Sequence, residues 1–476
     1  MHDQKKEKQV LLPEEQETAA REHERVGALY KSVLGSTKAQ QYNADTLENT
    51  EALLLAVPEA YTAYNCRRLA FKAVVATLSC SDVSVTDTEA ATSASRRQEE
   101  WLVQELKLNS KVLMLNYKNY SAFSHRHWIF DQLVGLATVE MQQVAECATG
   151  TAVGTTVPRM YEVLRSLLRK EREQCEQLLQ LDERNFHAWN YRRWVLAQEL
   201  RATGLAAAYC SAASSLASAK DATQPSASAT PGLVFFSAEE AGELEYTTRK
   251  IKNNFSNYSA WHQRSLAIQS AVARWQRYQQ AQAGSADTAG DAREHLQAWR
   301  AALLMQLRED VDFLKQAMYC DPNDQSAWFY APFVFQLLRS QYRCHEEDAV
   351  ALENAFIHAV IELVAEVDRM GTEGECYLPY YFLLDQLITL PATSLERHIT
   401  ALSEKVPSLL ASANGEAAGD GNGTKPWQRC FEYLHARLSR ADTFRRCLYD
   451  DLFQRALQDC PLRRESPADH PPPPSR

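Results

Sequence analysis

Residues 185–194 read N-F-H-A-W-N-Y-R-R-W, and related segments occur four more times along the chain. Each copy has an aromatic residue three positions after its opening residue, and the first four copies have Arg six positions after it. The fifth copy has Ala331 at that place, followed by Pro332. The copies open at Tyr61, Tyr120, Phe186, Tyr258 and Gln325. Such an internal repeat predicts an array of similar supersecondary units.

The start of each copy has the composition of a helix N-terminus. Asn119, Asn185 and Asn257 directly precede three of the opening residues, and Asn is a preferred N-cap because its side-chain oxygen accepts a hydrogen bond from the first turn. Asp324 can act in the same way before the fifth copy. An amphipathic run precedes each copy, as at 163–179. The sequence therefore predicts helical hairpins that stack into an all-α fold, an α-α superhelix.

The aromatic residues of the copies are predicted to be structural. Positions 0, +3 and +7 of a helix lie near one face, so the opening aromatic and the one after it are expected to stack along that face. The second aromatic of each copy is expected to be core rather than part of a site. These second aromatics are Tyr64, Phe123, Trp189, Trp261 and Trp328.

Composition excludes several classes of protein. The 476 residues have a formal net charge of −10 at pH 7 and 24% charged residues, which argues against a nucleic-acid binder with a basic face. Eleven cysteines lie without any C-x-x-C pair, a pattern typical of a reduced intracellular chain rather than a disulfide framework or zinc site. No apolar run reaches membrane-spanning length and no signal peptide is visible. We expect a cytoplasmic protein without membrane insertion.

The repeats divide the chain into regions. The prediction places an N-terminal segment and helix at 1–40, five helical-hairpin repeats at 41–345, and further helices at 346–411 that complete the solenoid. Low-complexity insertions interrupt the repeats near 81–95, 149–158, 205–238 and 281–291, and they are expected to be solvated spacers. A linker at 412–424, closing helices at 425–462 and a Pro-rich disordered tail at 463–476 follow.

The motif resembles the protein prenyltransferase α-subunit repeat, N-Y-x-x-W-x-x-R-R. Within that family, residues 254–262 (N-F-S-N-Y-S-A-W-H) and 321–330 (D-P-N-D-Q-S-A-W-F-Y) look like the Rab-type branch, also called geranylgeranyltransferase type II. The opening Met1-His2 and the segment 442–452 (D-T-F-R-R-C-L-Y-D-D-L) are similar as well. The fifth repeat departs from the pattern, because residues 331–333 (A-P-F) stand where the family usually has His-Arg-Trp.

The resemblance implies an obligate subunit of a heterodimeric enzyme that is inactive without its β subunit. The family reaction transfers a geranylgeranyl group from geranylgeranyl diphosphate to C-terminal cysteines of Rab GTPases, which the Rab escort protein presents. Zinc and the isoprenoid pocket are implied to lie on the β subunit. Two alternatives stay open: the α subunit shared by farnesyltransferase and geranylgeranyltransferase type I, and a non-catalytic helical-repeat scaffold.

The resemblance also points to a diphosphate site. Lys118, in the turn before Tyr120, occupies the position of the family's diphosphate-contacting lysine. The adjacent helix N-terminus favours an anion through its dipole and free N–H groups. Tyr120 could donate a phenol hydrogen bond to the same group. The alternatives are a solvated turn lysine and a tyrosine of the repeat core.

Candidates for contact with the β subunit come from the same repeats. The +6 arginines are expected to brace neighbouring helices, with some facing the β subunit, and the histidines are structural in the alternative interpretation. His2 could reach the partner's zinc, as the similar opening of related subunits suggests, or could be a disordered terminal residue. The interface candidates are His125, Arg126, His187, Arg192 and Arg264.

Overall fold

A computed structural model describes most of the chain, and all of its described elements are helical. The prediction of an all-α fold is confirmed. The chain falls into two compact units, Met1–Ala227 and Ser228–Arg476, which are treated separately below. The residues described are 12–80, 88–147, 158–218, 235–282, 289–342, 346–371, 376–406, 409 and 425–463.

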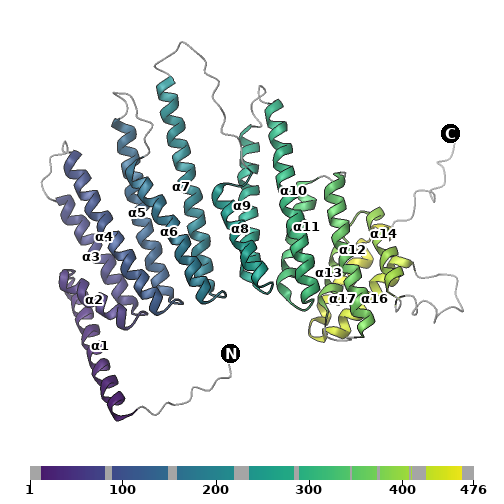
Figure 1. The fold of residues 1–476 in the computed structure, drawn as a ribbon, viewed down its shortest axis with the longest axis horizontal. Helices are drawn as coiled ribbons and strands as arrows, with labels where there is room; N and C mark the ends of the chain where they lie inside the picture. Colours follow the sequence, from purple (N-terminus) through teal and green to yellow (C-terminus); the bar gives the residue numbers. More distant parts are fainter. Residues whose placement is uncertain are drawn as a thin grey trace, which may run out of the picture. The chain divides into compact units, whose positions relative to one another are not determined.

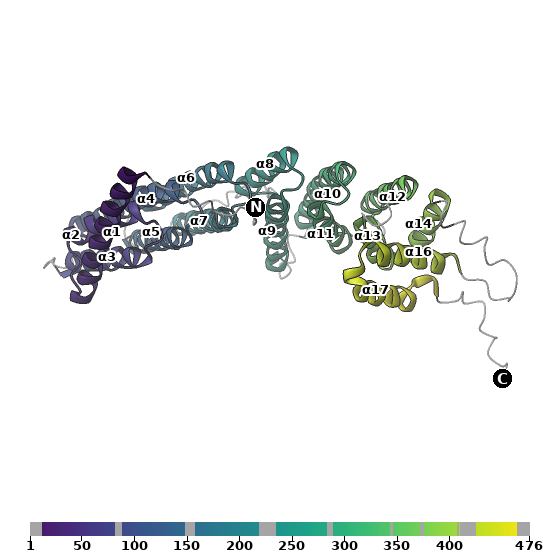
Figure 2. The ribbon, with the colours of Figure 1, turned by 90° about the horizontal axis from the view of Figure 1, so that it is seen from below.

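The first unit is a row of helical hairpins preceded by one helix. Consecutive helices pack side by side (Figure 1). Viewed along the helices, α2, α4 and α6 form one layer and α3, α5 and α7 form the other (Figure 2). Each hairpin thus gives its first helix to one layer and its second helix to the other. The bounds are α1 (Pro13–Ala39), α2 (Ala44–Ala56), α3 (Tyr61–Cys80), α4 (Thr88–Leu115), α5 (Tyr120–Cys147), α6 (Arg159–Leu181) and α7 (Phe186–Ser218).

The second unit continues the same hairpin pattern and closes with shorter helices. Within it, α8, α10, α12 and α14 form one layer, and α9, α11 and α13 lie in the other (Figure 2). The bounds are α8 (Ala238–Asn253), α9 (Tyr258–Gln282), α10 (Ala289–Cys320), α11 (Gln325–Gln341), α12 (Glu347–Met370), α13 (Leu378–Leu387), α14 (Ala392–Lys405), α16 (Pro426–Ala441), η2 (Thr443–Arg445), α17 (Arg446–Asp459) and η3 (Pro461–Arg463).

Parts of two predicted insertions are helical, so the segments between the helices are shorter than expected. Residues 88–95 belong to α4, and residues 205–218 continue α7. Both segments are rich in Ala, the strongest helix former, so they extend the neighbouring helix instead of leaving it. Residues 81–87 and 219–234 of these two insertions, the predicted linker 412–424, and all of the predicted tail except Arg463 lie outside the described residues.

Each opening residue is the first residue of a helix, as the repeats predict. The side-chain oxygen of Asn185 accepts hydrogen bonds from the backbone N–H of His187 at 3.1 Å and of Ala188 at 3.2 Å. Its amide also donates to the carbonyl of Tyr117 in the preceding repeat, at 2.7 Å. The cap therefore fixes the start of α7 and joins two neighbouring turns. Asn119, Asn257 and Asp324 cap α5, α9 and α11 in the same manner.

The second aromatic of each copy is buried. The indole N–H of Trp189 donates to the carbonyl of Glu183 at 2.8 Å, six residues earlier. Trp261 and Trp328 make the same bond to Phe255 and Pro322. These bonds satisfy the buried indole N–H and tie each turn to the helix that follows it. The buried set is Tyr64, Phe123, Trp189, Trp261 and Trp328.

The opening aromatics do not share that face, so the expectation that they stack in the core is wrong. Tyr61 is 67% exposed, Tyr120 73% and Phe186 62%. A step of three residues turns the helix by about 300°, which leaves the opening side chain roughly 60° away from the second aromatic. The buried face of the helix is formed by positions +3, +5 and +6 rather than by +7. The opening side chain therefore lies at the edge of that face and turns to solvent.

Replacing Asn185 with alanine is expected to destabilise the chain by about 2 kcal/mol, since it removes a cap and leaves buried backbone groups unpaired. Urea denaturation of both proteins measures the difference in unfolding free energy. Asn190→Ala is the control, because Asn190 is exposed and its side chain accepts from Arg193 and from no other described residue. Equal losses in the two variants would contradict the structural role of the cap.

The second unit contains a buried histidine whose pKa is strongly lowered. His398 of α14 is 2% exposed, and its Nε2–H donates to Asn354 Oδ1 of α12 at 2.9 Å. Its Nδ1 is buried and accepts no hydrogen bond from the residues that the structure describes. Desolvation, with smaller effects of Arg397 and His358, lowers the pKa of His398 to about 4.

This shift predicts a pH dependence of stability. The unfolded chain binds the His398 proton below about pH 6.5, whereas the folded chain does so only near pH 4. Stability is therefore full above pH 6.5 and falls between pH 6.5 and 4, by about 3 kcal/mol at most. His398→Gln keeps a donor to Asn354 and removes the titration. Denaturation of both proteins across this range should show the difference, and parallel pH profiles would contradict it.

Candidate functional site

The first helices carry buried acids that the sequence interpretation missed. One acid lies fifteen residues before the opening residue of copies two to five, and each is nearly inaccessible to solvent. The residue at +5 of the same copy bonds it in every case. The acids are Glu105, Glu171, Glu243 and Asp310, and their +5 partners are His125, Tyr191, Gln263 and Tyr330.

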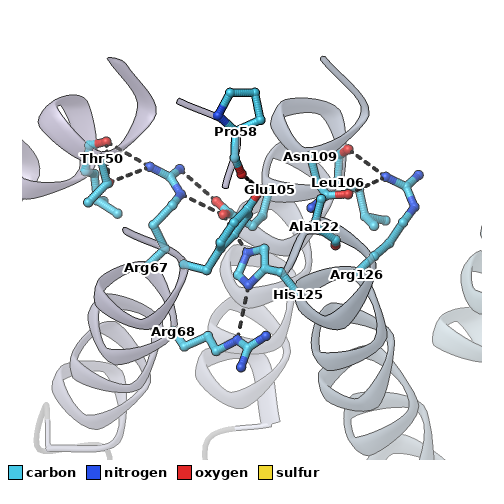
Figure 3. A network of polar contacts seen from close by, with 12 residues as sticks. Thr50, Pro58, Arg67, Arg68, Glu105, Leu106, Asn109, Ala122, His125 and Arg126 are labelled. Carbon is cyan, nitrogen blue, oxygen red and sulfur yellow. Dashed lines mark hydrogen bonds and ion pairs between the residues drawn. The ribbon is translucent and has the colours of Figure 1, made fainter. Parts of the chain in front are cut away.

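The +6 arginine of the preceding copy completes this arrangement. Arg67 of α3 donates from Nε to Glu105 Oε1 at 2.6 Å and from Nη2 to Oε2 at 2.7 Å (Figure 3). Its Nη1 donates to the Leu47 carbonyl at 2.8 Å and to Thr50 Oγ1 at 3.0 Å. One guanidinium thus joins α2, α3 and α4. We call an arginine of one copy paired with the buried acid of the next an arginine–acid bridge.

Two further arginine–acid bridges have the same form. Arg126 Nη2 donates to Glu171 Oε1 at 2.7 Å, and Tyr191 donates to the same carboxylate at 2.8 Å. In the second unit, Arg264 donates to Asp310 Oδ1 from Nη2 at 2.6 Å. Burial alone would lower the pKa of Arg126, but the carboxylate of Glu171 raises it above its ordinary value. These bridges are charged, and they hold successive hairpins in register.

These contacts correct the interface prediction for four residues. His125, Arg126, Arg192 and Arg264 are at most 2% exposed and bond within the chain. Such side chains present almost no surface to a partner subunit, so bracing is the role that the geometry supports. His187 is partly exposed and stays a candidate.

The fifth copy has no arginine at +6 and therefore cannot form an arginine–acid bridge. Ala331 is fully buried at the +6 position, and Pro332 follows it inside α11. Beyond this copy no residue takes the +6 position, and the ring of Phe335 lies 5.3 Å from Phe356 of α12 and 5.5 Å from Phe382 of α13. The closing helices are joined both by such aromatic packing and by ion pairs of a different spacing, such as that of Arg339 with Glu353 of α12.

Lys118 stands at the surface of the first unit. It lies in the turn between α4 and α5, and its side chain is 58% exposed. Its Nζ forms an ion pair with Asp182 Oδ2 at 2.7 Å, in the turn between α6 and α7. The hydrogen bond that the Lys118 ammonium donates to the Asp182 carboxylate lowers the pKa of Asp182 and raises the pKa of Lys118. The ammonium is therefore charged and held at the end of the hairpins.

Aromatic and imidazole rings lie in and beside the turns that hold this ion pair. The ring of Tyr120 lies 6.0 Å from that of His187, and Phe186 lies 4.0 Å from the same imidazole. Burial and the nearby charge of Lys118 both lower the pKa of His187. The structure thus places Tyr120 near His187, and His187 near the charge of Lys118. Each of these three side chains can donate a hydrogen bond. The sequence interpretation had placed His187 elsewhere, at the β-subunit interface.

Asp182 was missed, although a signal for it exists. An Asn or Asp stands three residues before the cap of each described turn from the second copy onward, and its side chain accepts a hydrogen bond from a backbone N–H two residues later. This is the pattern of an Asx-turn. Only in the third copy does its charge reach Lys118.

The described residues hold no group of three or more His, Cys, Asp or Glu side chains placed to bind a metal ion. Among the helices described, none is both long and apolar enough to cross a membrane. His2 lies outside the described residues.

Comparison with known proteins identifies the repeats. The family model described as "Protein prenyltransferase alpha subunit repeat" matches residues 102–133, 168–199, 241–271 and 307–338. Each match contains one buried acid and the start of the second helix of the same hairpin. The conserved unit of the family model is therefore the hairpin that the structure shows.

Relatives carry the name "Geranylgeranyl transferase type-2 subunit alpha". The chain is 25% identical to the Candida albicans protein over 337 residues, which cover 70% of this chain and 71% of that one. It is 28% identical to the Rattus norvegicus protein over 67% of this chain, and 24% identical to the Saccharomyces cerevisiae protein over 64%. The match spans 40% of the rat protein and 62% of the yeast protein. Four segments of the chain are therefore identified as protein prenyltransferase alpha-subunit repeats, and the chain is similar to the subunits named above over about two thirds of its length.

Proposed function

We propose that this chain is the α subunit of a cytoplasmic Rab geranylgeranyltransferase, a heterodimer with a prenyltransferase β subunit. The observation that carries the proposal is the set of four matching repeats, together with relatives named as type-2 α subunits. Its substrates are geranylgeranyl diphosphate and the C-terminal cysteines of Rab GTPases, presented by the Rab escort protein. Zinc would lie on the β subunit, where it would hold the attacking thiolate.

Lys118 is the residue of this chain that we propose acts in the reaction. A cysteine thiolate forms a bond to C1 of the isoprenoid while the bond from C1 to the diphosphate oxygen breaks. The diphosphate leaves with that electron pair, so negative charge develops on its oxygens. Lys118 would stabilise this charge, with Tyr120 and His187 donating hydrogen bonds beside it. The exposure of Lys118, its nearness to His187 and the contact of His187 with Tyr120 support this role.

We propose that Asp182 is the partner of Lys118 when no diphosphate is bound. In the free chain its carboxylate pairs with the Lys118 ammonium at 2.7 Å. Both side chains are accessible, and an ion pair in such a place contributes little stability. A diphosphate, which carries more negative charge, can therefore replace Asp182 as the partner of Lys118.

Exposed aromatics support a partner that covers the hairpin ends. In the first unit, Tyr61, Tyr120 and Phe186 turn to solvent at the starts of three neighbouring second helices. In the second unit, Tyr258 at the start of α9 and Phe329 in the second turn of α11 are also exposed, and their ring centroids lie 6.4 Å apart. Aromatic side chains are enriched where proteins meet. We propose that the β subunit covers these residues.

The identity of the bound β subunit tests the substrate class. Co-expression with the type II β subunit should give a stable 1:1 complex on gel filtration. Parallel co-expression with the β subunits of farnesyltransferase and of geranylgeranyltransferase type I is the comparison. A stable complex with either of these, and none with the type II subunit, would replace the proposal with the shared α subunit.

A further inference from the structure

The two consecutive arginines at the end of the repeat motif have opposite environments. Arg67 is buried and paired with Glu105. Arg68, the next residue, is only partly buried, and its Nε donates to His125 Nδ1 at 3.2 Å. Its Nη1 and Nη2 donate no hydrogen bond to any residue that the structure describes, and the guanidinium extends away from Glu105 (Figure 3).

The charges around Arg68 do not balance. His125 accepts from Arg68 on Nδ1 and therefore donates from Nε2 to Glu105 at 2.8 Å, which makes its ring neutral. The charge of Glu105 is matched by Arg67. Within the described part of the chain, Arg68 has no carboxylate partner, and burial lowers its pKa without any opposing carboxylate. A partly desolvated cation without a counter-ion is unfavourable.

An arginine at the same position of the third copy also lacks a carboxylate partner in the described part of the chain. Arg193 of α7 stands seven residues after Phe186, as Arg68 stands seven after Tyr61. It donates to Asn190 Oδ1 and has no carboxylate partner among the described residues. Burial lowers the pKa of Arg193 as well. Two second helices of the first unit therefore hold a half-buried arginine whose charge the chain leaves unmatched.

Each of these arginines follows an exposed opening aromatic by seven residues, Tyr61 for Arg68 and Phe186 for Arg193. Residues seven apart lie two turns apart on one helix face, so Tyr61 and Arg68 share a face of α3. Tyr61 is 67% exposed, and Leu69 beside Arg68 is 37% exposed. An exposed aromatic next to an arginine is the composition of a protein interface. A free phosphate or other small anion would leave this apolar surface uncovered.

The geometry of Arg68 selects a carboxylate. Its guanidinium lies over the ring of Trp128, 5.8 Å from the centroid, which restricts its orientation. Because Nε is used by His125, the edge formed by Nη1 and Nη2 stays open. That edge presents two parallel N–H donors, which match the two oxygens of one carboxylate.

We propose that Arg68 and Arg193 are docking sites for Asp or Glu side chains of the partner subunit, one carboxylate on each guanidinium. This inference rests on the proposed function only in requiring a β subunit that covers α3 and α7. In this proposal the two consecutive arginines of a copy have different roles. The first, such as Arg67, forms an arginine–acid bridge inside the chain, and the second, such as Arg68, binds the partner subunit.

Arg68→Met tests the inference, with Lys72→Met as the matched control, since Lys72 is an exposed cation on the same face of α3. The affinity of each full-length variant for the β subunit is measured by titration. We expect Arg68→Met to weaken assembly at least about 30-fold, because one partner of a buried ion pair is lost. Lys72→Met should change affinity less than about threefold, as a rim charge does. Arg68→Lys, which keeps the charge without the two-donor edge, should fall between them.

Thermal unfolding of the isolated chain separates docking from folding. Arg68→Met should unfold at the same or a higher temperature than the parent, since it removes a cation without a counter-ion. If the parent forms no complex with any β subunit, the proposed function fails. If the parent assembles and Arg68→Met binds with the parent's affinity, only this inference is wrong. Inorganic phosphate is added to the isolated parent and to Arg68→Met as a second comparison. If Arg68→Met assembles like the parent and phosphate stabilises only the parent, the site binds a small anion instead.

Discussion

Replacement of Lys118 by alanine is expected to slow prenyl transfer by the assembled heterodimer by about 10²-fold or more, as loss of one group that stabilises developing charge does. The loss should appear in kcat, because the charge on the diphosphate is largest in the transition state. Affinity for the β subunit should not change, because the Lys118 side chain is exposed and its ion pair with Asp182 is accessible. Single-turnover transfer of labelled geranylgeranyl to a Rab substrate measures the rate.

Two variants control this experiment. Lys111→Ala removes an exposed lysine of α4 outside the turn and should leave the rate unchanged. Lys118→Arg keeps a positive charge at the turn and should recover much of the lost rate. If Lys118→Ala transferred the prenyl group at the parental rate, this chain would be a scaffold without a chemical role.

Replacement of Glu171 by alanine is expected to destabilise the chain by about 3–5 kcal/mol, the largest structural effect that we predict for a single residue. The change leaves Arg126 buried with no carboxylate and deprives Tyr191 of its acceptor. Denaturant unfolding with two probes measures the free energy and shows whether the first unit unfolds separately.

Glu173→Ala is the matched control, because Glu173 is an exposed acid on the same helix, and it should cost less than about 0.5 kcal/mol. The double variant Glu171→Met with Arg126→Met should regain most of the stability, since removing both charges avoids an unpaired buried ion. A double variant as unstable as Glu171→Ala would mean that the arginine–acid bridge has no ionic role.

The repeats made the hairpins predictable. Caps such as Asn185 and core aromatics such as Trp189 carry local signals, because a helix N-terminus and a buried ring need particular residue types. The buried acids do not carry such a signal. Glu171 sits among charged residues of an amphipathic helix and resembles the exposed Glu173. Only its fixed spacing from the next copy distinguishes it, and its partner Arg126 comes from a different hairpin.

The candidate site was predictable in part. Lys118 and Tyr120 follow from the resemblance, but their neighbours depend on how adjacent turns come together. Asp182 and His187 belong to the next repeat, 64 and 69 positions beyond Lys118 in the sequence. Contacts of that separation depend on the stacking of hairpins, which no single segment specifies. The sequence interpretation placed Arg126 at the β-subunit interface for the same reason. The stacking of hairpins that buries Arg126 is not visible in a single segment.

Reconstitution of transfer from purified subunits tests the central claim most directly. This chain, its type II β subunit, Rab escort protein and a Rab GTPase are combined with labelled geranylgeranyl diphosphate. The account predicts label on the Rab only when both subunits are present, and none on the Rab with either subunit alone. A β subunit that transfers the label at the same rate without this chain would contradict the account.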